Sequence, residues 1–113
     1  MDETHHTAVL ALTTLPDQDA ARQLARQLLE SHLVACVNIL PAARSMYWWK
    51  GQLEESDECV LLLKTTSERW PALKQALPAL HSYDVPELLA FDVADGLEPY
   101  LQWLVTEVQG AAQ

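Results

Sequence analysis

The chain has 113 residues, of which 50% are hydrophobic and 20% are charged. This length and composition are typical of one globular domain with its own core, and they argue against a disordered chain. The 16 Asp and Glu residues outnumber the 7 Lys and Arg residues, so the net charge is −9. Because an acidic surface repels phosphate groups, we expect neither nucleic acid nor a membrane as a partner, and small cations are the more compatible ligands.

Neither a membrane span nor a signal peptide is expected. No apolar run approaches the ~20 residues that a membrane-spanning helix needs. The polar start at residues 1–6 has no basic stretch followed by an apolar one, as an export signal would. We therefore predict a cytoplasmic protein, with a flexible tail at residues 1–6 and a single domain at residues 7–109.

The first half of the chain predicts a strand, a helix and a long second strand. Residues 7–15 are an apolar, β-branched run that predicts a buried strand. Asp17 is placed to cap the helix that follows. The apolar face of this helix recurs at steps of three and four: Ala21, Leu24, Ala25, Leu28 and His32. Residues 33–49 lack a helical period and contain Pro41, which predicts a long edge strand with a bulge.

The second half returns along the hairpin and repeats the pattern. A turn at residues 50–52 leads to a strand at residues 53–66. Ser67 is predicted to cap a second helix, which Pro78 bends or ends early. The buried face of that helix is expected to hold Trp70, Leu73, Leu77 and Leu80. A loop at residues 81–86, a strand at residues 87–93 and a C-terminal helix between residues 97 and 108 complete the chain.

This order predicts an α+β fold of the ferredoxin-like βαββαβ kind, with an antiparallel sheet, two helices on one face and an extra C-terminal helix. The first helix is about 21 Å long, whereas the strand at residues 33–49 would reach about 55 Å. The hairpin must therefore overhang the helices, and its overhanging end carries Met46, Tyr47, Trp48 and Trp49. Since exposed aromatic side chains on an edge invite association, we predict an oligomer. The alternative is that the C-terminal helix folds back over the hairpin.

The two cysteines are predicted to be unpaired. If the hairpin turns at Gly51, then Cys36 faces Thr66 and Cys59 faces Ala43. The cysteines would then lie about 23 Å apart, too far for a disulfide. A buried structural thiol is the simplest interpretation of each cysteine.

Cys and His are nonetheless ligands that suit copper or zinc. His81 is expected on a loop near Tyr83, Asp84 and Glu87, which predicts either a metal or small-molecule site or a histidine that supports the turn. His5 and His6 could bind metal adventitiously, and His32 is expected at a helix end, as a cap or as a residue at the edge of the core. The sequence has no glycine-rich phosphate loop and no CxxC, HExxH or GxSxG motif, so we predict no enzyme.

Five segments in order resemble the CutA divalent-cation tolerance proteins. They are LVACVNILP at residues 33–41, YWWKGQL at 47–53, LLLKTT at 61–66, HSYDVPELL at 81–89 and YLQWL at 100–104. The resemblance implies a ferredoxin-like protomer, a homotrimer assembled through the long hairpins, and a cytoplasmic role in tolerance to divalent cations, above all copper. It also implies an architecture akin to the trimeric PII signalling proteins, which bind effectors between subunits.

The resemblance also carries over to single residues. Cys36 matches the Ala-Cys-Val motif of the family, and His81, Tyr83, Pro86 and Glu87 match its His-Pro-Tyr…Pro-Glu loop. Ser82 replaces the usual proline of that loop. Some members carry a cysteine near the position of Thr13, and Cys59 matches no motif of the family.

The function expected is a non-enzymatic homotrimer that binds Cu(II) or another divalent metal through Cys36 and His81 and requires no cofactor. The alternative is a PII-like module that takes a small-molecule or protein effector at the intersubunit cleft. Its pocket would hold Lys64, Tyr83, Asp84, Glu87 and Trp103. A third possibility is a stable scaffold without a ligand.

Overall fold

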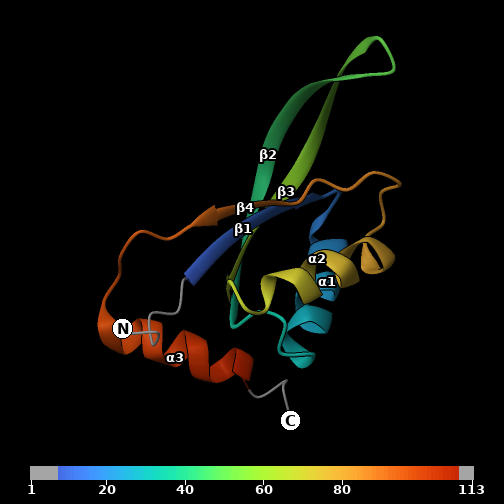
Figure 1. The fold of residues 1–113 in the computed structure, drawn as a ribbon. Helices are drawn as coiled ribbons and strands as arrows, with labels where there is room; N and C mark the ends of the chain where they lie inside the picture. Colours follow the sequence, from blue (N-terminus) through green and yellow to red (C-terminus); the bar gives the residue numbers. More distant parts are fainter. Residues whose placement is uncertain (1–7, 110–113) are drawn as a thin grey trace.

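The computed structural model describes residues 8–109; the predicted tail at residues 1–6 lies outside that range. It contains β1 (Ala8–Leu15), α1 (Gln18–Glu30), β2 (Cys36–Trp49), β3 (Gln52–Thr66), α2 (Trp70–Leu80), β4 (Leu89–Asp92) and α3 (Glu98–Gln109). The strands form one antiparallel sheet in the order β2-β3-β1-β4. The predicted ferredoxin-like order with an added C-terminal helix is confirmed, as is the edge position of β2 (Figure 1).

The core lies between the sheet and the helices α1 and α2. Every second side chain of β1 and β3 points into it, as the two-residue period of a strand requires. Apolar side chains with no more than 2% exposure fill it: Ala11, Leu15, Ala21, Leu24, Leu28, Val34, Leu61, Leu63, Leu73 and Leu77. Cys59 joins this cluster at 4% exposure, which agrees with the interpretation of a buried structural thiol.

The ends of α1 follow from local hydrogen bonding. The Asp17 carboxylate accepts the Ala20 N–H at 2.8 Å, which confirms the predicted N-cap. At the other end the Leu33 N–H donates to the Leu28 carbonyl, and His32 takes a left-handed φ of 56°. This is a Schellman termination, so His32 sits at a helix end as predicted. The His32 Nδ1 also lies 2.8 Å from the Glu107 carbonyl of α3.

Several predicted boundaries were wrong, and β2 begins at Cys36 rather than at residue 33. Arg69, not Ser67, precedes α2, and the Arg69 N–H is held by the Thr66 carbonyl at 3.1 Å, without a side-chain cap from Ser67. The helix continues two residues past Pro78 to Leu80, although proline lacks the N–H that would donate one helical hydrogen bond. The last strand spans only four residues, since β4 pairs with β1 alone over that length.

The hairpin of β2 and β3 extends far beyond the rest of the protein (Figure 1). With the hairpin included, the protein measures 49 × 26 × 22 Å. The hairpin turn consists of two residues, Lys50 and Gly51, with φ values of 51° and 79°. Two positive values define a type I′ turn, which matches the twist of the flanking strands. Trp48 remains 74% exposed, and α3 packs against β3 and β1 at the opposite end from the tip. The alternative in which the C-terminal helix covers the hairpin is therefore wrong.

The predicted bulge is present, but the predicted register was wrong. Pro41 and Ala42 lie between the Leu40–Val60 and Ala43–Glu58 pairs, so β2 carries one extra residue there. The two-residue turn and this bulge each shift the pairing by one position, and Cys36 therefore faces Lys64 rather than Thr66. Cys59 lies opposite the bulge rather than facing Ala43. Both thiols are free, as expected.

Candidate functional site

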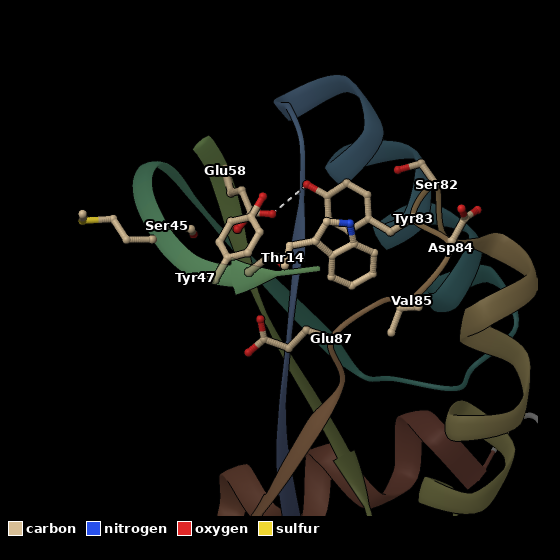
Figure 2. Close-up of a pocket in the computed structure, with 11 residues that line it drawn as sticks. Thr14, Ser45, Tyr47, Glu58, Ser82, Tyr83, Asp84, Val85 and Glu87 are labelled. Carbon is tan, nitrogen blue, oxygen red and sulfur yellow. Dashed lines mark hydrogen bonds between the residues drawn. The ribbon is translucent and has the colours of Figure 1, made fainter. Parts of the chain in front are cut away.

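A cleft of about 680 Å³ opens between the hairpin and the segment that follows α2 (Figure 2). The segment after α2 contributes Ser82, Tyr83, Asp84, Val85 and Glu87, and the strands contribute Thr14, Ser45, Met46, Tyr47, Trp49 and Glu58. Aromatic rings, hydroxyl groups and carboxylates line the cleft, and none of the lining residues is Lys, Arg or His. The electrostatic character of the cleft is therefore acidic.

The bulge in β2 decides which aromatic side chains reach the cleft. Paired residues on antiparallel strands share a face, and an extra residue in one strand exchanges its two faces. Because Ala43 pairs with Glu58, alternation places Tyr47 and Trp49 on the same face as Glu58. If the pairing continued from Leu40 and Val60 without a bulge, Ala42 would face Glu58, and Met46 and Trp48 would take that face instead. The bulge therefore places Tyr47 and Trp49 in the wall of the cleft.

The Glu58 and Tyr83 side chains form the short hydrogen bond at the centre of the cleft. The Tyr83 hydroxyl donates to Glu58 Oε2 at 2.6 Å (Figure 2). Burial and then the bond to the Glu58 carboxylate raise the pKa of Tyr83, so the phenol stays protonated and remains a donor. Glu58 itself is only 8% exposed.

His81 supports the segment that carries Tyr83. Its Nδ1 accepts the Tyr83 N–H at 3.0 Å, which assigns the ring hydrogen to Nε2; this nitrogen donates to the Thr14 carbonyl at 2.8 Å. Burial lowers the pKa of His81 below its ordinary 6.5. Both nitrogens of the neutral ring are thus engaged, and neither has a lone pair for a metal ion in this arrangement. The histidine supports the turn, one of the two interpretations that the sequence left open.

The lowered pKa of His81 predicts a loss of stability in mild acid. Above pH 6.5 neither state binds the proton; below it the unfolded chain takes up a proton that the folded chain does not, so stability falls. The loss is at most about 1.4 kcal/mol per pH unit. Urea unfolding measures the free energy of unfolding of the wild type and of His81→Gln at pH 7.5 and 5.5. The wild type should exceed the variant by less at pH 5.5, because glutamine can donate to Thr14 but does not titrate. An equal advantage at both pH values would contradict this assignment.

Thr13 holds the end of the same segment. It is fully buried, and its hydroxyl donates to the Glu87 carbonyl at 2.6 Å. Together, the His81 and Thr13 bonds tie both ends of the segment between α2 and β4 to strand β1. The cleft wall is therefore fixed at both ends, although Ser82 replaces the proline that the family resemblance leads one to expect.

The two predicted metal ligands lie apart within one chain. Cys36 is half-buried at the start of β2 and pairs with Lys64, which in turn faces Leu10. His81 binds Thr14, four residues and about 13 Å further along β1. Among residues 8–109, no three His, Cys, Asp or Glu side chains are grouped so that they could hold a metal ion. A metal site at Cys36 and His81 stays a prediction, and one chain does not assemble it in this arrangement.

The five predicted pocket residues fall into two groups. Tyr83, Asp84 and Glu87 line the cleft. Lys64 and Trp103 lie elsewhere, both near Tyr100: the Lys64 Nζ is 5.8 Å from the Tyr100 ring centroid, and the Trp103 ring centroid is 5.5 Å from it. The sequence prediction missed Glu58, because the residue follows a polar run and only its pairing with Ala43 turns it into the cleft.

Comparison with known proteins identifies the family of this chain. The CutA1 divalent ion tolerance protein model matches residues 9–107. The divalent-cation tolerance protein CutA of Thermus thermophilus is 45% identical over 95 residues, which cover 84% of this chain and 92% of that protein. The protein of the same name from Pyrococcus horikoshii is 41% identical over 101 residues, which cover 89% and 98%.

The solved structures that are similar to this chain belong to divalent cation tolerance proteins as well. The Cut A1 structure from Thermus thermophilus superposes with a TM-score of 0.86 at 43% identity and covers 88% of this chain and 97% of that chain. The Archaeoglobus fulgidus structure, described as a periplasmic divalent cation tolerance protein, gives a TM-score of 0.86 at 35% identity, with coverages of 89% and 98%. No helix within residues 8–109 has both the length and the apolar character needed to cross a membrane.

Proposed function

The chain belongs to the CutA1 divalent ion tolerance protein family, and from this premise we propose that it is a non-enzymatic homotrimer that binds a divalent cation, Cu(II) above all, and contributes to metal tolerance. The observation that carries the proposal is the family match across residues 9–107, nearly the whole described domain. The names of the matched relatives favour this function over a PII-like effector module.

Exposed apolar side chains on the hairpin and on the sheet support the proposed homotrimer. On the hairpin, the cross-strand neighbours Trp48 and Leu53 are 74% and 60% exposed. On the sheet face opposite α1 and α2, Leu89 and Phe91 of β4 pair with Leu12 and Leu10 of β1 and are about half exposed. Contiguous apolar patches of this kind mark interaction surfaces. Both β2 and β4 are edge strands, so each copy offers two open edges to its neighbours.

The metal is proposed to bind where copies meet. Cys36 is the first residue of the edge strand β2 and is half-buried. It therefore lies at the open edge of the sheet, where a neighbouring copy can approach. Because no group of three ligands exists among residues 8–109 of one chain, a second copy would complete the coordination. The acidic net charge of −9 favours cation binding in general.

Calorimetric titration of the full-length His5→Ala/His6→Ala protein with Cu(II) tests the proposal without the adventitious ligands of the tail. We expect saturable binding that Cys36→Ser abolishes and that Cys59→Ala, the matched change at the buried thiol, leaves intact. His81→Gln should weaken binding only if the histidine turns towards the metal in the assembly. Zn(II), which a thiol cannot reduce, repeats the measurement without redox chemistry.

Absence of saturable binding of either metal would refute metal binding, and binding unchanged by both Cys36→Ser and His81→Gln would reject these two residues as its ligands. The cytoplasmic location is a separate part of the proposal, and the relative from Archaeoglobus fulgidus is described as periplasmic. Cell fractionation with an antibody against the native protein decides between the two compartments.

A further inference from the structure

We propose that the cleft beside the hairpin binds a small protonated organic amine, with the Glu58 carboxylate receiving the cationic nitrogen and the surrounding aromatic rings enclosing the apolar body. This goes beyond metal tolerance and concerns a different group of residues from Cys36. The result of the Cu(II) titration therefore neither supports nor contradicts this proposal.

The first support is a buried negative charge that lacks a cation. Glu58 is 8% exposed, and the only hydrogen bond that its carboxylate receives within residues 8–109 comes from the neutral Tyr83 hydroxyl. No ion pair among the described residues includes Glu58. Arg44 binds Glu55 and Asp57, which lie on the opposite face of the hairpin. An unpaired buried carboxylate is costly because it has lost its hydration, so a cation that enters the cleft recovers that cost.

The second support is the wall around this charge. Figure 2 shows the Tyr83 hydroxyl pointing at the Glu58 carboxylate, and the Tyr47 and Trp49 rings also line the cleft. Aromatic faces attract cations, ammonium and guanidinium groups in particular. One ammonium group already lies near such a ring, with Lys50 Nζ 5.7 Å from the Trp49 centroid, but Lys50 does not line the cleft. The volume of about 680 Å³ is that of a small-molecule pocket.

The same features argue against a bare metal ion or an anion in the cleft. Glu58 Oε2 is already bonded to Tyr83, and no three ligand side chains converge within residues 8–109. Asp84 and Glu87 add negative charge at the exposed rim, which repels phosphate and carboxylate ligands. One carboxylate surrounded by rings matches a single positive nitrogen on an apolar body.

The test uses the full-length protein and three probes that share one ring: benzylamine, benzyl alcohol and benzoate. We expect saturable binding of benzylamine, at least tenfold weaker binding of the neutral alcohol, and no binding of benzoate, by calorimetry or ligand-detected NMR. Glu58→Gln should weaken benzylamine at least tenfold without changing the alcohol, since glutamine keeps an acceptor for the Tyr83 hydroxyl. Glu55→Gln, the same change on the opposite face of the hairpin, should leave the benzylamine affinity unchanged.

Equal binding of amine and alcohol, or equal amine affinity in the wild type and Glu58→Gln, would overturn the proposal. The proposal would also be overturned if the wild type bound no amine and the Glu58→Gln protein dissociated into monomers. That result would assign the missing positive charge to a side chain of a neighbouring copy. Thermal unfolding of each variant checks that the fold is retained.

Discussion

Replacing Trp48 and Leu53 together with serine is expected to turn the proposed homotrimer into monomers that keep their fold. The two side chains pair across the hairpin and are 74% and 60% exposed in one chain, so they stabilise the monomer little. Burying an aromatic side chain removes about 150–250 Å² from water, worth about 4–6 kcal/mol at about 25 cal/mol per Å². Losing both side chains should therefore weaken each subunit contact by at least about 10³-fold. Light scattering after size-exclusion chromatography measures the mass.

The control for this variant is Leu80→Ser, which changes a partly exposed leucine on α2, away from the hairpin. It should leave the oligomer intact. A double variant that stays trimeric, with an unchanged circular dichroism spectrum, would contradict the role of the hairpin in assembly.

Replacing His81 with alanine is expected to lower the free energy of unfolding by about 2–4 kcal/mol. The change leaves the Tyr83 N–H and the Thr14 carbonyl without their partner, in a region where His81 is only 9% exposed. A buried polar group without a hydrogen bond costs about 1–3 kcal/mol. Urea unfolding at pH 8 and one protein concentration measures the loss, because His81 is neutral at that pH and assembly depends on concentration.

His32→Ala is the matched control, since His32 is exposed and, within residues 8–109, its ring makes one hydrogen bond, with the Glu107 carbonyl. It should cost less than about 1 kcal/mol, because water replaces that bond. Equal losses in the two variants would show that His81 does not hold the cleft wall. Loss of Cu(II) binding in His81→Ala alone would not identify a metal ligand, which is why His81→Gln serves in the titration.

The sequence predicted the order of the elements because each depends on a local pattern. The step of three and four residues along α1 and the proline in β2 are local signals, and both predictions are confirmed. The register depended instead on the two-residue turn at Lys50 and Gly51 and on how many residues the bulge inserts. Neither could be counted from the sequence, so the facing partner of Cys36 was wrong by two positions.

The candidate site was harder to predict for the same reason. Tyr83, Asp84 and Glu87 stood out because they surround a histidine on a loop. Glu58 did not, because it becomes part of the cleft only through its pairing with Ala43 beyond the bulge. Residue chemistry alone also could not show that both nitrogens of His81 are already hydrogen-bonded. Local patterns therefore predict the fold, whereas long-range pairing determines the site.

Native mass spectrometry of the full-length His5→Ala/His6→Ala protein, with and without Cu(II), tests the proposed metal-binding homotrimer most directly. We predict a dominant species of about 38 kDa, three times the 12.7 kDa of one chain, with discrete Cu(II) adducts that saturate. A 12.7 kDa species that dominates at micromolar concentration, or a trimer that takes up no Cu(II), would contradict the account.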